Sequence, residues 1–302
     1  MSLAGFFQHL VNALSLGGIY ALIAIGYTMV YGILRLINFA HGDVFTYGIY
    51  FAFYAVVLFL MPWWVAFVFS IFATAFLGAF IERIAYRPLR NAPRISALIT
   101  AIGVSFFLEN FAIVAFGGRA KSFNPQTGIY PTSFLNMINI GGVRIPVLTF
   151  ITIGIVIAAL VLLIWIVYRT KIGMAMRAIS KDIPTTKLMG VNADRVVSFT
   201  FMLGSGLAAI GGILWAMKYP QVYPYTGMIP GLKAFIAAVV GGIGSIQGAM
   251  VGGFILGISE IMIVAFVPSL AGYRDAFAYA ILLFVLLVKP TGILGVEVSE
   301  KV

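Results

Sequence analysis

The chain contains no cysteine, and charged residues make up only 9% of it, against the roughly 25% that is usual for soluble domains. Without cysteine there is no disulfide, no thiol nucleophile and no cysteine-ligated metal. The two histidines, His9 and His41, are far apart and have no metal-ligand partner at helical spacing. Because 62% of the residues are hydrophobic, one soluble core is excluded, and the composition predicts an all-α polytopic membrane protein.

Several catalytic motifs are also missing. The glycine-rich residues 241–248 lack the Gly-Lys-Ser/Thr ending of a P-loop and the glycine spacing of a dinucleotide site. No serine stands in a Gly-x-Ser-x-Gly elbow, and no paired aspartates typical of an intramembrane protease occur within the spans. We therefore expect no enzyme activity, no nucleotide site, and no cofactor or metal in this chain. His41 is expected to be a hydrogen-bonding wall residue and not a catalyst.

Acidic residues are scarce, with 9 against 19 basic ones and a net charge of +10. In so apolar a chain the basic excess is explained by membrane lipid and topology, since nucleic-acid binding would need a soluble basic face. Two loops carry the excess, residues 83–94 and residues 169–195, which the positive-inside rule places in the cytoplasm. The polar residues 117–146 form the expected external loop.

Long apolar runs predict about eight spanning or near-spanning segments. The first 14 residues either lie along the interface or extend the first span, and no cleavable signal peptide is expected. A run at 232–243 is too short to cross a bilayer. The other expected spans are residues 20–34, 44–61, 62–81, 95–116, 147–168, 196–217, 246–267 and 279–288.

Loop 169–195 has structure of its own. Pro184 is suited to the first turn of a helix and Gly190 to the left-handed residue that ends one, which predicts a helix near 184–189 preceded by another near 174–181. These helices offer more apolar surface than a tether needs, so we expect the loop to dock a cytoplasmic partner. The alternative is a charged connector that only fixes topology. The apolar residues are Met174, Met176, Ile179, Leu188 and Met189.

Two polar or glycine-rich breaks interrupt the apolar pattern. The side chains of Asn38, His41 and Asp43 would be costly facing lipid, so they should face a protein interior or a wet cavity. Paired breaks are typical of transporters built from structural repeats, with half-helix ends lining the path. Candidate path residues are Asn38, His41, Gly42, Asp43, Gly241, Gly242, Gly244 and Ser245.

Other intramembrane residues have less specific explanations. Gly244, Gly248 and Gly252 stand at i, i+4 and i+8, which indicates one smooth helix face for packing, with Gly248 and Gly252 assigned to that role. Glu109 and Glu260 stay without an assigned role. Lys233 can snorkel toward the interface.

Five ordered motifs carry a family resemblance across nearly the whole chain. The chain resembles LivH-type permease subunits of branched-chain amino acid ABC importers, with Asp43 standing where that family usually has Glu. The motifs are YALIAIGYTMVYG at 20–32, INFAHGD at 37–43, ERIAYRP at 82–88, GGIGS at 241–245 and PTGILG at 290–295.

The resemblance implies one transmembrane permease domain over residues 1–302 that forms half of a translocation path in the bacterial inner membrane. It implies as partners a LivM-type second permease, two cytoplasmic ATPases that hold the ATP and magnesium, and a periplasmic amino-acid-binding protein. The alternatives are a permease for another amino acid, an amide or urea, an ion-coupled secondary transporter, and a channel. Within loop 169–195, the resemblance places ATPase coupling at Arg177, Ala178, Asp182, Leu188 and Gly190.

Overall fold

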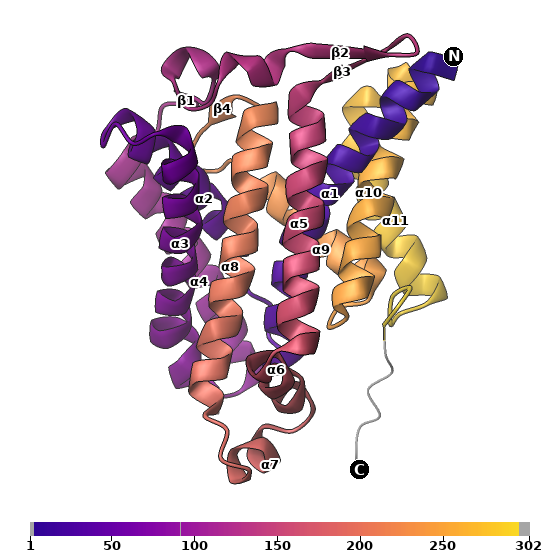
Figure 1. Cartoon of the computed structure of the whole chain (residues 1–302). Coiled ribbons are helices and arrows are strands. Elements are labelled where there is room, and N and C mark those ends of the chain that lie inside the picture. Colours follow the sequence, from indigo (N-terminus) through magenta and orange to yellow (C-terminus); the bar gives the residue numbers. More distant parts are fainter. Residues whose placement is uncertain (1–2, 91, 296–302) are drawn as a thin grey trace.

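The computed structural model describes residues 3–90 and 92–295, and it is a bundle of helices with two short two-stranded antiparallel sheets at one end (Figure 1). The predicted all-α polytopic fold is confirmed. The long helices are α1 (Leu3–Leu34), α3 (Trp63–Ile81), α4 (Arg94–Phe116), α5 (Val147–Arg169), α8 (Ala193–Lys218), α10 (Ile246–Phe266) and α11 (Arg274–Val288). Helix α11 forms a 21-residue apolar span together with the preceding 3-10 helix Pro268–Tyr273. The shorter ones are α2 (His41–Val57), α6 (Lys171–Lys181), α7 (Ile183–Leu188) and α9 (Met228–Gly241).

Seven helices in the described part of the chain are long and apolar enough to cross a membrane. The first residues extend α1 and do not lie apart from it, because the helix already begins at Leu3. Helices α2 and α9 have 17 and 14 residues, fewer than the roughly 20 that a full crossing needs. They fill the interior beside complete spans, so the expected total of about eight crossings corresponds to seven long helices and two short ones.

The connecting loops separate to two ends of the bundle (Figure 1). At one end, antiparallel strands β2 (Met137–Ile140) and β3 (Val143–Pro146) pair, as do β1 (Lys121–Ser122) and β4 (Gln221–Val222). At the other end lie α6 and α7. Asp194 accepts hydrogen bonds there from Arg87 and, at 2.5 Å, from Arg90. The two basic loops are therefore neighbours, and the loop at 117–146 lies opposite, as the charge pattern predicts.

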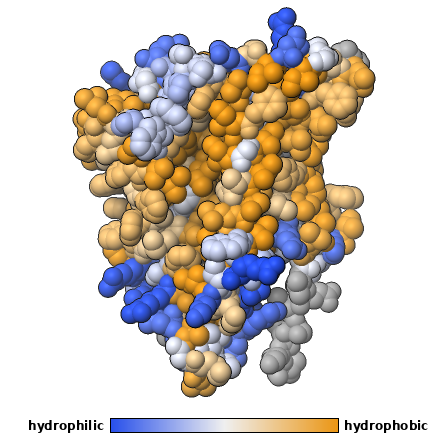
Figure 2. Space-filling model, in the orientation of Figure 1, coloured by the Kyte–Doolittle hydropathy of each residue, from blue (hydrophilic) through white to orange (hydrophobic). Residues whose placement is uncertain are grey.

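Helix α1 is the centre of the bundle, and most of its residues are buried. Small residues allow α10 to cross it closely: a Cβ added at Gly253 would lie 2.5 Å from the Ala21 Cα, and one at Gly257 would overlap Gly17. Backbones this close gain van der Waals contact, which drives association of helices in lipid. Apolar side chains cover the middle of the face that Figure 2 shows.

Candidate functional site

The polar residues of the first break surround the start of α2, inside the bundle. Asn38 lies in the connection at 35–40, whereas His41, Gly42 and Asp43 form the first turn of α2. The expectation that the break extends to residue 43 is therefore wrong, because the chain is already helical at His41. The side chains are almost fully buried, with exposed fractions of 3% for Asn38, 1% for His41 and 5% for Asp43, so they face protein and not lipid, as predicted.

Each of these polar side chains contacts a different part of the chain. The Tyr86 hydroxyl donates to the Asn38 Oδ1 at 2.8 Å, and the Ser105 hydroxyl donates to the Asp43 Oδ2 at 2.5 Å. The His41 ring lies edge-on to the Tyr27 ring, with centroids 4.6 Å apart. The break thus connects α1, α2, α4 and the π-helical turn Glu82–Tyr86.

The start of α9 lies directly against the start of α2. The Gly227 amide donates to the Thr46 hydroxyl at 2.8 Å, and a Cβ on Gly42 would lie 2.8 Å from the Gly227 carbonyl oxygen. A Cβ on Gly231 would be equally close to the Gly42 Cα. Two short helices therefore begin side by side within the bundle, and their positive dipole ends lie close together. This geometry is typical of broken helices at a transporter site.

The sequence did not single out this second helix start. The segment 219–227 contains three tyrosines and two prolines and resembles an ordinary external turn, yet it leads from the end of α8 to a buried position beside Thr46. The signal that was available is the pair Gly227 and Gly231, one helical turn apart at the beginning of a run too short to span.

The predicted break at 241–245 lies at the other end of α9. Gly241 is the last residue of α9, the chain is non-helical from 242 to 245, and the Ser245 hydroxyl caps α10 by accepting from the Gly248 amide at 3.1 Å. The C-terminal segment packs here: the Leu294 amide donates to the Gly241 carbonyl at 2.8 Å. This break therefore lies at the opposite end of α9 from the helix start at Gly227, and the role of the two predicted breaks in one path stays a prediction.

The prediction that Gly244, Gly248 and Gly252 share one helix face is partly wrong. Gly244 precedes α10, has φ +97° and would have open space around a Cβ. Gly248 and Gly252 do lie in α10 and face α9, where an added Cβ would meet the Gly241 carbonyl and the Ala237 carbonyl. The positive φ explains glycine at 244 without any helix neighbour.

Helix α6 is anchored to the end of the bundle. The Thr170 hydroxyl caps it by accepting from the Gly173 amide at 3.1 Å, and Met176 and Ile179 are buried. Arg177 and Ala178 are exposed, and the Arg177 guanidinium lies 5.2 Å from the centre of the Tyr168 ring. The helix at 171–181 is three residues longer at its start than the sequence suggests, because Thr170 supplies the cap.

Helix α7 forms the tip of the molecule beyond α6 (Figure 1). The Asp182 carboxylate caps it by accepting from the Thr185 amide at 3.1 Å, and Gly190 has φ +82°, as expected for the residue after a helix. Leu188 and Met189 are 87% and 80% exposed, and Figure 2 shows apolar atoms at this tip below a hydrophilic band. An apolar tip outside the membrane-facing surface indicates a contact with another protein.

A charged cluster joins α1, α9, α10 and α11, with Lys233 and Glu260 buried and Asp275 exposed at the start of α11. The Lys233 ammonium pairs with Glu260 at 2.9 Å and with Asp275 at 2.7 Å, and the Tyr20 hydroxyl donates to Glu260 at 2.9 Å. The Lys233 side chain is only 8% exposed, so the snorkelling explanation is wrong. In the part of the chain that the structure describes, no group of three or more His, Cys, Asp or Glu side chains is placed to hold a metal.

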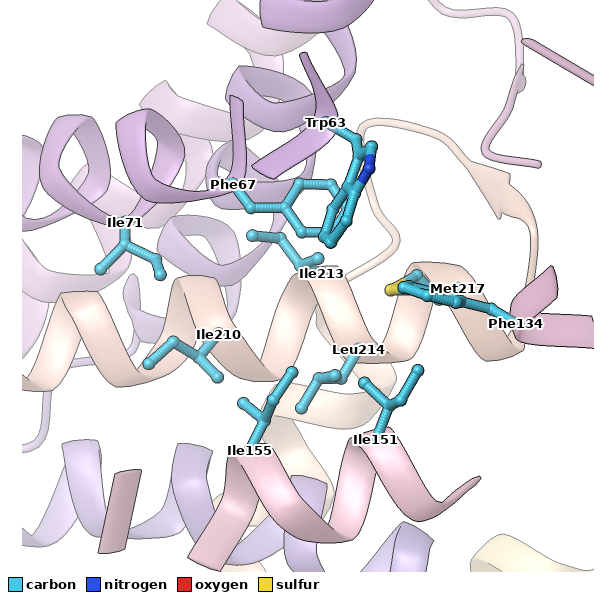
Figure 3. A pocket seen from close by; sticks show the side chains of 10 residues that line it. All are labelled: Trp63, Phe67, Ile71, Phe134, Ile151, Ile155, Ile210, Ile213, Leu214 and Met217. Carbon is cyan, nitrogen blue, oxygen red and sulfur yellow. The ribbon is translucent and has the colours of Figure 1, made fainter. Parts of the chain in front are cut away.

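An apolar cavity of about 330 Å³ lies between α3, α5 and α8 (Figure 3). Its walls are aliphatic and aromatic side chains, and among the described residues that line it, the indole of Trp63 is the one side chain with a strong hydrogen-bond donor. Sites for polar small molecules combine apolar walls with several converging polar groups. This cavity therefore lacks what would orient an amino acid. It is lined by Trp63, Phe67, Ile71, Phe134, Ile151, Ile155, Ile210, Ile213, Leu214 and Met217.

Comparisons with known proteins agree over almost the whole chain. Residues 9–286 match a family described as "Branched-chain amino acid transport system / permease component". The chain is 43% identical to the high-affinity branched-chain amino acid transport system permease protein LivH of Escherichia coli strain K12, over 98% of both chains. It is also 43% identical, over 98% of both chains, to the corresponding protein BraD of Pseudomonas aeruginosa.

Proposed function

The chain belongs to the permease family of branched-chain amino acid transport systems, and on this premise we propose that it forms half of the translocation path of a binding-protein-dependent ABC importer for branched-chain amino acids. Its partners are a LivM-type second permease, two cytoplasmic ATPases that bind ATP and magnesium, and a periplasmic amino-acid-binding protein. The importer resides in the bacterial inner membrane. The chain itself contributes no catalytic group and no cofactor.

The observation that carries the proposal is the exposed apolar tip formed by Leu188 and Met189. These side chains lie at the end of a capped helix, and α6 fixes that helix to the bundle through buried Met176 and Ile179. A partner that binds the tip therefore pushes on a rigid element and not on a flexible tether. This is the property that a coupling loop needs to pass movement from an ATPase to the membrane helices.

The path in this proposal includes the paired helix starts at Gly42 and Gly227. The positive dipole ends of the two helices favour the carboxylate of an amino acid, as helix N-termini do for anions in general. Asn38, His41 and Asp43 are assigned as polar supports of this region, and Gly241, Gly242, Gly244 and Ser245 as the junction below α9. Movement of α9 relative to α2 alters the helix starts, which suits alternating access.

A substitution at the tip tests the proposal. Leu188→Asp places a charge where an apolar contact is expected, so the ATPases should be lost from the purified complex and uptake of leucine into vesicles should fall at least about tenfold, the equivalent of about 1.4 kcal/mol of contact energy. Met137→Asp is the matched control, because Met137 is 64% exposed at the opposite end. Full ATPase retention and uptake in Leu188→Asp would contradict the coupling role.

A further inference from the structure

The outward face of α4 carries polar groups where lipid would otherwise be. Helix α4 lies at the edge of the bundle, and most of its span is exposed (Figure 1). Its buried contacts come from one stripe, and at about 100° per residue the opposite side holds Gly103 and Asn110, both exposed. The buried stripe is Ala97, Ala101, Leu108 and Ala112.

The polar side chain of Asn110 lies on the outward face of α4, at a depth where hydrocarbon would surround it. It stands more than a turn from either end of the span Ile95–Phe116, and its side-chain amide donates only to the Phe106 carbonyl of its own helix, at 2.8 Å. The carboxamide oxygen has no partner among the described residues. A polar group left unsatisfied in lipid is costly, whereas asparagines that bond across to another helix hold membrane helices together.

Gly103 makes the same face suitable for close approach. It is two helical turns from Asn110 on the same side of α4, and nothing lies within 4 Å of the Cβ that a larger residue would place there. Neither local strain nor contact within the chain explains a glycine here. A small residue beside a hydrogen-bonding residue is the pattern of a helix–helix contact in membranes.

A line of polar side chains leads from the candidate path to the edge of this face. Asp43, at the start of α2, accepts a hydrogen bond from Ser105, and Glu109 follows Ser105 by one helical turn. Glu109 is half-buried, and within the described part of the chain it has no hydrogen-bond or ion-pair partner. These polar side chains therefore reach the outer surface of the bundle at Glu109, whose carboxylate would be costly beside lipid and favours a polar group on a neighbouring subunit.

We propose that the face of α4 centred on Gly103 and Asn110 is the interface with a transmembrane helix of a second, homologous permease subunit, and that Glu109 borders the path shared by the two. The inference rests on the proposed function and names the surface that completes its path. A second copy of this chain fits less well, because it would bring a second Glu109 carboxylate into the same layer of low dielectric. A different subunit can place a donor or a basic group there.

Photocrosslinking in the assembled importer tests the surface directly. Benzoylphenylalanine replaces Phe107, which is 64% exposed on α4, or Phe72, which is 60% exposed on α3 and serves as the matched control. The complex of this chain, the second permease and the ATPases is purified in lipid nanodiscs and irradiated. We expect an adduct with the second permease from position 107 only. An adduct from position 72 alone, or an adduct of position 107 with a second copy of this chain, would overturn the proposal.

A substitution that spares the fold gives an independent measure. The side chain at position 110 lies on the face of α4 that is turned away from the bundle. Asn110→Leu should therefore insert into the membrane and elute in size-exclusion chromatography as the unmodified chain does. The amount of second permease that co-purifies should fall about tenfold, which corresponds to a loss of about 1.4 kcal/mol of binding free energy. Phe72→Leu should retain it fully. Equal retention in both variants would contradict the interface.

The two proposals fail in different ways. If position 107 gives no adduct while Leu188→Asp still removes the ATPases and uptake, the ABC function stands and the α4 interface is wrong. If no second permease accompanies the unmodified chain, the proposed function itself is wrong.

Discussion

The Lys233 ammonium lies 2.9 Å from the Glu260 carboxylate, and both groups are buried among helices α1, α9, α10 and α11. Asp275 supplies a second carboxylate at 2.7 Å from the same ammonium, and Tyr20 donates to Glu260. Lys233 belongs to α9, the short helix whose start meets α2. The cluster therefore fixes α9 to its neighbours on the side away from the candidate path.

Removing one charged side chain of this cluster should lower the thermal stability more than removing an oppositely charged pair. Lys233→Met leaves the buried Glu260 carboxylate with only the longer, partly exposed contact to the Arg274 guanidinium at 3.9 Å, and breaking a buried ion pair costs up to about 3–5 kcal/mol. The double variant Lys233→Met, Glu260→Gln removes both charges and should recover most of the lost stability. Thermal unfolding in detergent measures both, with the exposed Lys289→Met as control. Additive losses in the double variant would contradict a coupled pair.

The sequence predicts the helical class, the long spans and the relative placement of loops because each depends on local composition. Runs of apolar residues determine the spans, and clustered arginines determine which loops share an end. The helix at 183–188 is also predictable, since Pro184 and Gly190 mark its limits by backbone chemistry.

What the sequence does not reveal are contacts between distant segments. Nothing local to Lys233 indicates that Glu260 and Asp275 surround it, so snorkelling is the natural expectation. Likewise, Gly241 and Gly242 are conspicuous, while Gly227 is not, although Gly227 is the residue that packs on Gly42. Which glycine meets the start of α2 is decided by tertiary packing, and the pattern of a single chain does not contain it.

The bond between Tyr86 and Asn38 predicts a specific coupling. Asn38→Leu leaves the Tyr86 hydroxyl without its acceptor, and Tyr86→Phe removes the donor at 2.8 Å from Asn38. Each single change should lower stability by about 1–3 kcal/mol, since a buried polar group is left unpaired. The double change should cost less than the sum. Uptake per inserted protein and thermal unfolding are the measurements, and simple additivity would show that the bond does not matter.

The close contact between the starts of α2 and α9 predicts that one added methyl group lowers both thermal stability and uptake. Gly227→Ala would force a Cβ into the Gly42 carbonyl, so α9 must move away from α2. Gly154→Ala is the matched control, because Gly154 lies in α5 with no atom within 4 Å of an added Cβ. It should be neutral or stabilise by up to about 1 kcal/mol, as expected for alanine in a helix.

The measurement for this pair is the melting temperature of each purified variant together with its uptake. Gly227→Ala should lower both. Equal melting temperatures and equal uptake for the two variants would mean that α9 and α2 are not held at this distance during transport.

Orientation in the membrane is predicted by the charge of the loops at each end. The chain has no cysteine, so a single cysteine is labelled without background. A membrane-impermeant maleimide should modify Thr127→Cys in spheroplasts, whereas Leu188→Cys should react only after permeabilisation, because the arginine-rich end is retained in the cytoplasm. Both positions are exposed. Labelling of position 188 in sealed spheroplasts would reverse the topology.

The turn after α7 predicts a change that separates docking from folding. Gly190 has φ +82° and open space around an added Cβ, so the Cβ of Gly190→Leu meets no atom of this chain, but the substitution strains the backbone by about 1 kcal/mol. Gly128 has φ +74° and the same open space in the opposite loop. Gly190→Leu and Gly128→Leu should therefore reduce thermal stability equally.

Only Gly190→Leu is expected to affect coupling, because its new side chain projects from the tip that the ATPase contacts, next to Leu188 and Met189. Arg177→Glu should act in the same direction by reversing a charge on the exposed side of α6, more strongly at low salt, where screening is weak. ATP hydrolysis stimulated by the binding protein, measured in reconstituted vesicles beside leucine uptake, distinguishes the outcomes. If Gly190→Leu and Gly128→Leu retain the same stimulation and uptake, backbone strain alone explains both, and the turn after α7 is not part of the ATPase contact.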